Sequence, residues 1–388
     1  MHLKNPEIQF PHFLMKIDLF ASFIEIVTFV FMNLKNSIYS GVSGWLRLQE
    51  LILDYRKPGV YILVGENTEK KCLPLLLKKC KELSEAHIIK IQGGESNKTI
   101  TGVEKVWQLL AAGGARRGSL LVCLGGGVIS DIGGFAASTY KRGMDLINIP
   151  TTLLAMVDAA LGGKTGINMD SVKNQVGVFA QPKSVFIFTE FLKTLPAQQK
   201  LSGYAEMLKH AMIDSEHHFE MLIANPPESV FNEAAILKSA GVKVSVVEQD
   251  PSEGGLRKVL NFGHTIGHAI ESCSHQKDAV PLLHGEAIAI GLVCETYISV
   301  KMLDLDESEL IKITKLVSRH FPHYKLKSGS ADELLALMSH DKKNSDSSRL
   351  NFSLLHKIGE PVYDQFPAES LIRESLHFYL NVHVDLFE

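Results

Sequence analysis

From Val60 onward, short apolar runs alternate with segments of helical periodicity. Apolar runs rich in branched side chains predict strands, and apolar positions spaced by three and four residues predict helices. The predicted strands lie at 60–64, 87–91, 119–124, 146–149 and 184–188, and the predicted helices at 70–83 and 101–112. The run at 119–124 is apolar almost throughout, as a buried strand of a parallel sheet should be. This alternation favours an α/β fold with a parallel, Rossmann-like sheet covered by helices.

The second half of the chain has a different pattern. After about residue 200 helical periodicity dominates, and the final stretch, 369–388, is predicted to be a helix that packs this part shut. We therefore predict an N-terminal extension at 1–40, an α/β domain at 41–200 and a mostly α-helical domain at 201–388. Neither a low-complexity linker nor a repeat separates the two domains. We expect them to share a tight interface, with the functional site in the cleft between them.

The N-terminal extension contains an apolar stretch at 17–32. Asp18 and Glu25 interrupt it, and its 16 residues fall short of the roughly 20 that span a bilayer. It also lacks the charged start and small-residue cleavage site of a secretory signal. We expect a packed or partly ordered helix here. The alternative is an upstream extension that is foreign to the natural product, with Met15 or Met32 as the real start.

Composition excludes several classes of function. The 388 residues are 45% apolar and 21% charged, as in an ordinary globular protein, and the net charge is −3. Basic residues occur as isolated pairs, such as Arg116-Arg117 and Lys342-Lys343, so a nucleic-acid partner is not indicated. The five cysteines are scattered, which favours reduced thiols in a cytosolic protein over a disulfide framework.

The stretch at 260–271 is the strongest candidate for chemistry. In a helix, His264, His268 and Glu271 would project from one face. A single histidine on a helix is more often a packed core residue than a ligand. Two histidines four residues apart are harder to explain by packing alone. They stand beside Gly263 and Gly267, which give up helix propensity and which we expect to allow a close approach of another segment. The pattern therefore favours a metal-binding or acid/base face.

Partners for this face occur elsewhere in the chain. His284 stands in Leu-His-Gly-Glu at 283–286, and Glu206 stands in a helical stretch at 203–210. Two imidazoles and one carboxylate with an open position are the ligand set of a catalytic zinc ion. A structural zinc site would instead have four protein ligands rich in cysteine.

Two glycine-rich stretches follow predicted strands. Gly125-Gly126-Gly127 opens a predicted helix, where backbone N–H groups can approach a phosphate. The usual dinucleotide fingerprint would have its third glycine where this chain has Ser130, so a tight packing turn explains the stretch equally well. The segment 162–168 mixes Gly, Lys, Thr and Asn, and we expect a loop that lines a cleft. Asp158 replaces the first glycine of a nucleotide-triphosphatase loop, which disfavours that class.

Charged residues cluster before the histidine pair. Glu206 and Lys209 share a helix face, and the residues that lead into His264 include Lys243, Glu253, Arg257 and Asn261. Each alone is more often a surface residue. Asp341-Lys342-Lys343 is either an exposed charged turn or a segment that closes over an anionic substrate.

Several of these motifs occur together, in order and at fixed spacing. They are Gly-Gly-Gly-x-x-x-Asp at 125–131, Arg142-Gly143, Pro-Thr-Thr-Leu-Leu at 150–154, Asp158, Gly-Gly-Lys-Thr-Gly-Ile-Asn at 162–168, Lys173-Asn174, Ala-Glu-x-x-Lys at 205–209, Gly-Leu-Arg at 255–257, Leu-Asn-Phe-Gly-His-Thr-x-Gly-His-Ala-x-Glu at 260–271 and His-Gly-Glu at 284–286. In these motifs the chain resembles the 3-dehydroquinate synthases. The resemblance runs from about residue 60 to 360 and leaves residues 1–40 outside.

The resemblance implies a homodimeric, cytosolic enzyme of the shikimate pathway that uses NAD and a divalent metal, zinc or cobalt. It implies that the metal ligands are Glu206, His264 and His284. The implied NAD-binding residues are Gly93, Gly94, Glu95, Ser96, Asn97, Lys98, Gly127, Val128, Ile129, Ser130, Asp131, Thr151, Thr152, Lys164, Lys173, Phe191, Leu192, Lys193 and Thr194.

The resemblance also implies the substrate, 3-deoxy-arabino-heptulosonate 7-phosphate, and its conversion to 3-dehydroquinate. A transient oxidation by NAD would acidify a neighbouring proton, phosphate would leave, and ring opening with an aldol closure would follow reduction. The implied catalytic residues are Asp158, Lys164, Lys209, Lys243, Arg257, Asn261 and His268, with His268 as the choice for proton transfer. The implied phosphate contacts are Arg142, Asn174 and one of Lys342 and Lys343.

Departures from the family pattern are small. His210 stands where Tyr is common, Gln175-Val176 and Ala180 differ after Lys173-Asn174, and the segment between His268 and His284 is slightly long.

The alternatives belong to different classes. Another sugar-phosphate cyclase, which makes an amino-dehydroquinate, an inosose or a valiolone, would share the fold and cofactors. A metal-dependent alcohol or glycerol dehydrogenase would accumulate NADH and would have no dense shell of Lys, Arg and Asn. The apolar N-terminus suggests a non-catalytic, membrane-associated module, but the metal ligands and Lys164 are retained.

Overall fold

The computed structural model describes residues 37–57, 59–169, 172–325, 330–339 and 349–382. The expectations for the apolar stretch at 17–32, and the phosphate candidates Lys342 and Lys343, fall outside these residues. All of these described residues belong to one compact unit. Among the described helices, none combines the length and the apolar composition needed to cross a lipid bilayer.

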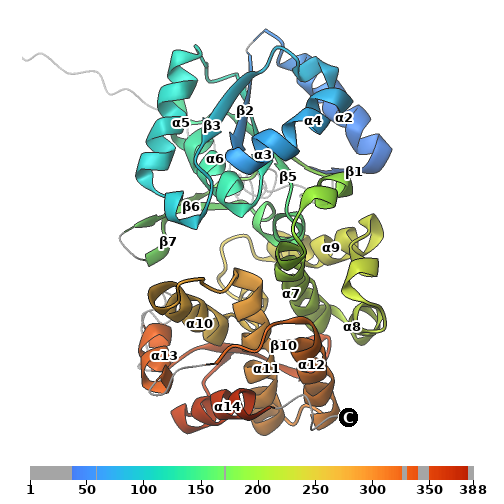
Figure 1. Ribbon diagram of the computed structural model, residues 1–388, viewed down its shortest axis with the longest axis vertical. Helices are drawn as coiled ribbons and strands as arrows, with labels where there is room; N and C mark the ends of the chain where they lie inside the picture. The colour runs from blue at the N-terminus through green and yellow to red at the C-terminus, as the bar shows by residue number, and fades with distance from the viewer. Residues whose placement is uncertain (1–36, 58, 170–171, 326–329, 340–348, 383–388) are drawn as a thin grey trace, which may run out of the picture. The chain divides into compact units, whose positions relative to one another are not determined.

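A six-stranded parallel sheet organises the first half of the chain (Figure 1). Its order is β1-β8-β5-β4-β2-β3, and every neighbouring pair is parallel. The strands are β1 (Ile38–Ser40), β2 (Val60–Gly65), β3 (His87–Ile91), β4 (Leu120–Gly125), β5 (Asp145–Pro150) and β8 (Ser184–Ile187). The predicted α/β fold and its five strands are confirmed, and β1 is an additional strand that the pattern did not predict.

Alternate residues of the central strands serve two separate cores. Tyr61 and Leu63 of β2 face the helices α5 (Ile100–Ala112) and α6 (Gly127–Thr139). Ile62 and Val64 face the opposite side, where α2 (Gly41–Asp54) and α4 (Leu73–Lys79) pack. Burial on both faces explains why these strands are apolar almost throughout.

The helix predicted at 70–83 is three shorter elements. They are α3 (Glu66–Lys71), α4 and a 3₁₀ turn η2 (Lys81–Leu83). Pro74 lies in the first turn of α4. Proline has no N–H group and its ring clashes with the carbonyl four residues earlier, so one continuous helix cannot pass through this point. The prediction of a single helix was therefore wrong.

The predicted loop at 162–168 is also wrong in part. After a turn at Gly162 and Gly163, both with positive φ, the chain forms β6 (Lys164–Met169), which pairs antiparallel with β7 (Val172–Phe179). Most of the side chains of this hairpin are exposed or half-buried. It is held by backbone pairing with little core behind it, so it has no hydrophobic pattern that sequence reasoning could detect.

The second half is helical, as predicted, except for one hairpin. Its helices are α7 (Ala197–Asp214), α8 (Glu216–Ile223), α9 (Glu233–Gln249), α10 (His264–Lys277), α11 (His284–Leu303), α12 (Glu307–His320), α13 (Ser330–Ser339) and α14 (Glu369–Asn381). The hairpin of β9 (Phe352–Lys357) and β10 (Glu360–Gln365) was not predicted. The first four residues of β9 are all buried, so it lacks alternation, and Pro361 weakens the strand signal in β10.

Short helical turns complete the chain and carry several of the polar residues discussed below. They are η3 (Glu95–Asn97), η4 (Tyr140–Arg142), η5 (Ala155–Ala159), η6 (Thr189–Thr194), η7 (Pro227–Val230) and η8 (Leu256–Asn261).

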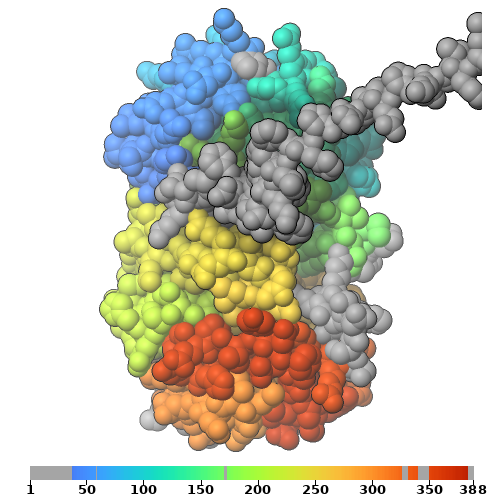
Figure 2. Space-filling model, turned by 180° about the vertical axis from the view of Figure 1, so that it is seen from behind, coloured from blue at the N-terminus to red at the C-terminus, as the bar shows by residue number. Residues whose placement is uncertain are grey.

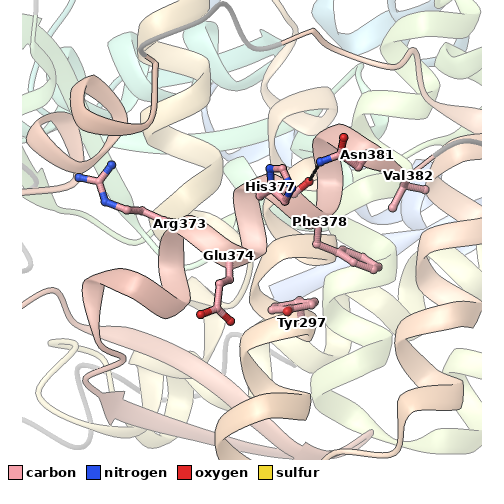
Figure 3. A pocket seen from close by; sticks show the side chains of 7 residues that line it. All are labelled: Tyr297, Arg373, Glu374, His377, Phe378, Asn381 and Val382. Atoms are coloured by element: carbon pink, nitrogen blue, oxygen red, sulfur yellow. Dashed lines mark hydrogen bonds between the residues drawn. The ribbon is translucent and has the colours of Figure 1, made fainter.

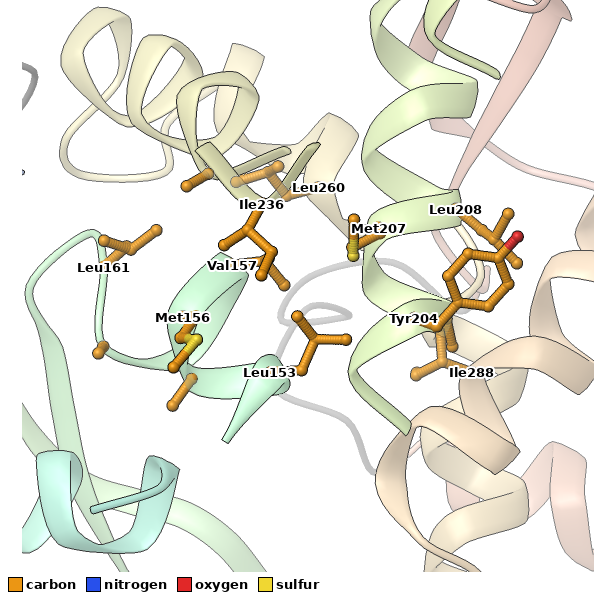
Figure 4. Close-up of a cluster of buried hydrophobic side chains, with 14 of the residues drawn as sticks. Leu153, Met156, Val157, Leu161, Tyr204, Met207, Leu208, Ile236, Leu260 and Ile288 are labelled. Atoms are coloured by element: carbon orange, nitrogen blue, oxygen red, sulfur yellow. The ribbon is translucent and has the colours of Figure 1, made fainter. Parts of the chain in front are cut away.

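One hydrophobic cluster connects the sheet region with the helical region. Leu153, Met156 and Val157, at and around η5, pack with Met207 of α7 and Ile236 of α9 (Figure 4). α7 is buried continuously from Ser202 to Ile213. The domain boundary that we predicted near residue 200 falls at the start of α7, just before this buried stretch, and the two regions share a core at this junction.

Helices α10 and α11 pack with almost no space between their backbones. A Cβ atom on Gly291 would lie 1.9 Å from the carbonyl oxygen of Gly263. A Cβ atom on Gly267 would lie 2.9 Å from Ile288 Cδ1 and 3.1 Å from the carbonyl oxygen of Ala287. The expectation that Gly263 and Gly267 serve close approach is therefore confirmed.

We predict that Gly291→Ala lowers the free energy of unfolding by about 3 kcal/mol, because backbone atoms cannot move aside for the new methyl group. Gly241→Ala is the matched control: Gly241 lies inside α9 with nothing within 4 Å of the added Cβ. That substitution should stabilise by about 0.5–1 kcal/mol. Urea unfolding of both variants checks the pair, and equal effects would contradict the packing argument.

Candidate active site

Three helices carry the predicted metal ligands. α10 begins at His264 and α11 begins at His284, so both imidazoles project from the first turn of a helix. Glu206 lies in the middle of α7 and is fully buried. α11 packs against both α7 and α10, which brings the three side chains together from distant parts of the sequence.

The Glu206 carboxylate lies beside both imidazoles. Its Oε1 is 3.4 Å from Nε2 of His264 and 3.3 Å from Nε2 of His284. Two ligand atoms held by one tetrahedral zinc ion at about 2.0–2.1 Å are about 3.3–3.4 Å apart. Oε2 forms an ion pair with Lys209, whereas Oε1 faces the two imidazoles without a hydrogen bond of good geometry to either of them or to any other described residue. A buried carboxylate oxygen without a donor is costly, and a divalent cation at this point would satisfy it.

The second nitrogen of each imidazole is held by an acceptor. Nδ1 of His264 lies 3.0 Å from the carbonyl oxygen of Phe262, and Nδ1 of His284 lies 3.2 Å from Oε2 of Glu271. These acceptors place the proton on Nδ1, so that in the neutral ring Nε2 carries its lone pair toward Glu206. A carbonyl or carboxylate behind the imidazole is the usual arrangement around a bound metal ion.

The surroundings shift the pKa values of the two imidazoles in opposite directions. Burial and Lys209 lower the pKa of His264 to about 3, against the effect of Glu206. Burial also lowers the pKa of His284, but Glu271 and Glu206 outweigh it and raise that pKa to about 10. At neutral pH His264 is therefore neutral and His284 is protonated; a metal ion would bind His284 only after that proton is lost.

The carboxylates of Glu206 and Glu271 are both ionised despite their burial. Burial raises the pKa of Glu206, but the ammonium group of Lys209 holds it well below its usual range. Burial likewise raises the pKa of Glu271, but His284 and Lys173 hold it well below that range. Lys173 Nζ lies 2.7 Å from Glu271 Oε1, so this residue of β7 contacts the carboxylate behind His284.

His268 completes a triangle of imidazoles. Its ring centroid lies 5.0 Å from that of His264 and 5.7 Å from that of His284. One ligand atom from each of these three residues falls within 4.8 Å of the others. The face predicted from His264, His268 and Glu271 is therefore assembled, with Glu271 behind His284.

A second polar cluster surrounds Asp158 of η5. Lys243 Nζ lies 2.7 Å from Asp158 Oδ1 and donates to the Asp158 backbone oxygen at 2.9 Å. Lys209 Nζ and His210 Nε2 lie 3.8 and 3.6 Å from the same Oδ1. Burial raises the pKa of Asp158, but Lys243 and Lys209 hold it well below its usual range. Because Lys209 also pairs with Glu206, it connects this cluster to the imidazoles.

The loop between α9 and η8 is shaped by one aspartate. Asp250 accepts from the backbone N–H groups of Gly254, Gly255 and Arg257 at 2.8–3.0 Å. The Arg257 side chain donates to the carbonyl oxygens of Pro251 at 2.7 Å and of Gly162 at 3.1 Å. Arg257 is therefore buried and connects this loop to the turn before β6.

Glu253 joins two predicted substrate contacts. Its carboxylate pairs with Lys164, and its Oε1 accepts from Nδ2 of Asn261 at 3.4 Å. Its backbone has φ of +63°, which is uncommon for a residue other than glycine. Burial lowers the pKa of Lys164, although Glu253 opposes that shift.

The β9–β10 hairpin supports the same region from the C-terminal side. Lys258 of η8 pairs with Asp364 of β10 at 2.8 Å, and Asn351 donates to Asp364 at 2.6 Å. Ser353 of β9 donates to the Lys258 carbonyl oxygen at 2.6 Å. In Figure 2, the yellow surface of the α9 region lies directly beside the red surface of the C-terminal segments. An element that was not predicted thus holds η8, which carries Arg257 and Asn261.

The nucleotide candidates gather at the carboxyl ends of the strands. α6 begins at Gly127 directly after β4, and its N-cap Gly126 provides no side-chain cap. The chain runs from β2 to β3 on one side of β2, and then crosses back to β4 on the other side. The strand order therefore reverses at β2. Open parallel sheets bind nucleotides at such a reversal, and free N–H groups at a helix N-terminus suit a phosphate. These features fit a dinucleotide.

Other nucleotide candidates form a polar network with the hairpin. Lys98 is 4% exposed, and its Nζ lies 2.5 Å from both Asp131 Oδ2 and Asn174 Oδ1. Burial raises the pKa of Asp131 to about 6, although Lys98 opposes the shift. Asn168 donates to Glu95 Oε1 at 2.9 Å and accepts from the Asn174 N–H at 2.9 Å. Asn174, a phosphate candidate, is thus already connected to Lys98.

Three further residues predicted to bind phosphate or NAD lie outside the clusters around Glu206 and Asp158. Arg142 is exposed at the end of η4, and within the described residues its side chain forms no ion pair or hydrogen bond with either cluster. Phe191 and Leu192 of η6 are core residues that are 2% and 4% exposed. The structure therefore brings together the predicted metal ligands, the lysines around Asp158 and the residues around Glu253. Arg142 lies outside these groups.

A surface hollow of about 620 Å³ lies between α11 and α14 (Figure 3). Its lining residues are Tyr297, Arg373, Glu374, His377, Phe378, Asn381 and Val382. None of them belongs to the clusters around Glu206 or Asp158, and we assign no chemistry to this hollow.

Two side chains in the clusters were absent from the predicted site. His210 contacts Asp158, and Glu253 contacts Lys164 and Asn261. Their only signal in the sequence is position: His210 follows Lys209, and Glu253 precedes Arg257 by four residues. A neighbour in sequence becomes a contact only through the fold, so this signal was too weak to select them.

The sequence comparisons agree on one family. Its two models, described as 3-dehydroquinate synthase N-terminal and 3-dehydroquinate synthase C-terminal, match residues 88–202 and 203–344. A curated 3-dehydroquinate synthase of Parabacteroides distasonis is 42% identical over 335 residues, which cover 86% of this chain and 94% of that protein.

Solved structures of two related cyclases have a similar fold. A 2-deoxy-scyllo-inosose synthase with carbaglucose-6-phosphate, NAD⁺ and Co²⁺ is 28% identical with a TM-score of 0.74, over 87% of this chain and 95% of that one. A 2-epi-5-epi-valiolone synthase from Streptomyces hygroscopicus with NAD⁺ and Zn²⁺ is 26% identical with a TM-score of 0.76, over 88% and 96%.

The buried His210 gives a prediction on pH. Burial and Lys209 lower the pKa of His210, although Asp158 opposes the shift. As the pH falls through about 6.5, the unfolded chain takes up a proton at this position more readily than the folded chain does, so the free energy of unfolding falls with falling pH. His210→Gln should reduce this slope by up to about 1.4 kcal/mol per pH unit.

Urea unfolding at about pH 7.5 and about pH 5.5 measures this slope. The exposed His217, on α8, supplies the matched control. His217→Gln should leave the slope close to that of the wild type, and an equal change in both variants would contradict the burial argument.

Proposed function

The chain belongs to the 3-dehydroquinate synthase family, and from this premise we propose that its site performs the family reaction. That reaction converts 3-deoxy-arabino-heptulosonate 7-phosphate to 3-dehydroquinate and inorganic phosphate, the second step of the shikimate pathway to aromatic amino acids. The observation that carries the proposal is the buried Glu206 carboxylate, within 3.4 Å of two imidazole Nε2 atoms and next to the lysines around Asp158.

Glu206, His264 and His284 hold the divalent metal in this proposal. The support is the donor set itself, because a carboxylate and two imidazoles with an open position suit a catalytic zinc or cobalt ion. The two solved cyclases are described with Co²⁺ and Zn²⁺. When bound, the metal stabilises negative charge on the substrate oxygens, and NAD takes up and returns a hydride.

NAD lies at the carboxyl ends of the strands in this proposal. The uncapped N-terminus of α6 receives the pyrophosphate, and Thr151 and Thr152 follow the adjacent strand β5. The segments at 93–98 and 191–194 complete the nucleotide site. Lys98 and Asp131, which form an ion pair, are also among the proposed NAD contacts.

The cationic side chains receive the anionic substrate. Lys164 and Arg257 lie around the loop of Glu253, and Lys209 and Lys243 lie around Asp158. The partners of these cations are carboxylates and carbonyl oxygens, and in this proposal the substrate's carboxylate and phosphate groups take over part of these charge-assisted hydrogen bonds. Asn261 adds a neutral donor beside Lys164.

His268 transfers the proton in this proposal. It is half-buried, whereas His264 is buried, so it can reach a substrate that lies over the metal. Imidazole titrates near neutral pH, which suits removal and return of a proton. Arg142, Asn174 and one of Lys342 and Lys343 stay proposed contacts of the phosphate by family resemblance.

The nearest alternative is the activity of a different sugar-phosphate cyclase. The solved inosose and valiolone synthases are 28% and 26% identical to this chain, whereas the curated 3-dehydroquinate synthase of Parabacteroides distasonis is 42% identical. This difference favours the heptulosonate as substrate. A homodimer in the cytoplasm is also proposed by family resemblance, and light scattering on the purified protein would measure its mass.

The first test is phosphate release from 3-deoxy-arabino-heptulosonate 7-phosphate with NAD and either zinc or cobalt. We expect phosphate release that a chelator abolishes, with no lasting absorbance of NADH, because the hydride is returned in each turnover. Steady accumulation of NADH would indicate a dehydrogenase. An intact protein that binds NAD but releases no phosphate would indicate another cyclase.

The metal assignment gives a separate prediction. Glu206→Gln keeps the shape of the side chain but removes its charge, so metal affinity and phosphate release should fall by at least about a hundredfold. His264→Ala should do the same. Glu220→Gln, which disturbs only the pair between Glu220 and Lys312, is the control. Calorimetric titration with zinc measures the affinity, and wild-type affinity in Glu206→Gln would refute the assignment.

A further inference from the structure

The N-terminus of α10 has no cap of its own. A capping box requires Ser or Thr at the N-cap and Glu or Gln three residues later. This helix has Gly263 at the N-cap and Ile266 at the third position, and neither side chain can accept a hydrogen bond. The first N–H groups of a buried helix need acceptors from somewhere else.

Glu295 of α11 supplies both acceptors. Its Oε2 accepts from the Gly263 N–H at 2.6 Å, and its Oε1 accepts from the Ile266 N–H at 3.0 Å. Glu295 is 0% exposed. One carboxylate from a neighbouring helix thus does what the two side chains of a capping box do, and its negative charge suits the positive end of the helix dipole.

The packing of the two helices explains why the cap comes from outside. Gly263 has φ of +78°, and a Cβ atom there would lie 2.7 Å from Leu292 Cδ2. Gly291 packs against the Gly263 carbonyl oxygen, where an added Cβ would be 1.9 Å away. A capping side chain therefore cannot stand at position 263, and Glu295, one turn after Gly291, is placed to replace it.

The same peptide group connects Glu295 to a proposed metal ligand. The N–H of Gly263 donates to Glu295, and the carbonyl oxygen of Phe262, in the same peptide unit, accepts from Nδ1 of His264. Hydrogen bonds in such a chain polarise one another inside a protein. The Glu295 carboxylate, acting through the peptide, makes the Phe262 carbonyl oxygen a stronger hydrogen-bond acceptor. The imidazole of His264 thereby becomes more basic, and its Nε2 becomes a stronger ligand for a metal ion.

We propose that Glu295 is a positioning residue for the metal site: through the Phe262–Gly263 peptide it fixes the ring orientation and tautomer of His264. The inference rests on the proposed function, in which His264 binds the metal. It adds a carboxylate that lies two hydrogen bonds behind the ligand, on the helix that also begins with His284.

The test titrates Co²⁺ alone into the full chain after metal removal with a chelator. Glu295→Ala leaves both N–H groups without an acceptor, and we expect affinity for Co²⁺ about 10–100-fold weaker than in the wild type. Glu295→Gln keeps the shape and one acceptor oxygen but turns an NH₂ group toward the second N–H, so a smaller loss is expected. The visible absorption bands of bound Co²⁺ should change in both variants, because the geometry at His264 changes.

Ser299→Ala is the matched control on the same helix. Ser299 is fully buried; its Oγ accepts from the Leu355 N–H at 3.1 Å and donates to the backbone oxygen of Glu295 at 2.8 Å. Ser299→Ala therefore also leaves a buried N–H group without an acceptor, and it touches the Glu295 backbone. It leaves in place the Glu295 carboxylate and the two hydrogen bonds that this carboxylate accepts from α10. We expect a lower midpoint of thermal unfolding with wild-type Co²⁺ affinity and spectrum.

The outcomes separate the two proposals. Wild-type affinity and spectrum in both Glu295 variants would overturn the positioning role while leaving the metal site intact. Equal weakening in Ser299→Ala would also overturn it, because the effect would then follow from lost stability. A wild-type protein that binds no Co²⁺ would refute the metal site itself, and with it the role of Glu295.

Discussion

The carboxylate of Glu206, buried in the middle of α7, is the constraint on which the rest of the structure depends. A buried charge is costly unless ion pairs and hydrogen bonds compensate it. Lys209 supplies one compensation, and the approach of Nε2 atoms from His264 and His284 supplies a place for another. Helices α10 and α11 each start at one of the two histidines, so the beginnings of both helices meet at Glu206.

Close packing of α10 against α11 brings the two histidines together, but it also leaves backbone N–H groups that need acceptors. The glycines at 263 and 291 let α10 and α11 approach until backbone touches backbone, but a glycine N-cap leaves the first N–H groups of α10 without side-chain acceptors. Glu295 satisfies them from the partner helix. The two helices are therefore joined both by van der Waals contact and by a buried carboxylate. Such a junction resists the small displacements that would spoil the geometry of ligand atoms.

Much of the fold could be predicted from the sequence, and the failures have physical reasons. The strands at 60–64 and 119–124 are buried on both faces, so their composition reveals them. The β6–β7 hairpin is largely exposed, and β9 lacks alternation, so neither has a periodic signal. The helix at 70–83 broke at Pro74 because the periodicity of apolar residues takes no account of a missing N–H group.

For the site, residue types were predictable but their pairings were not. Glu206, His264 and His284 were selected by their ligand chemistry and by the family motifs, and the structure brings both imidazoles within 3.4 Å of the carboxylate. The partner of Lys164 is Glu253, and the carboxylate behind His284 is Glu271. These contacts join residues 89 and 13 positions apart, so only the packed fold decides them. A motif can specify which atoms a reaction requires, whereas the orientation of those atoms depends on neighbours such as Glu295 that carry no motif.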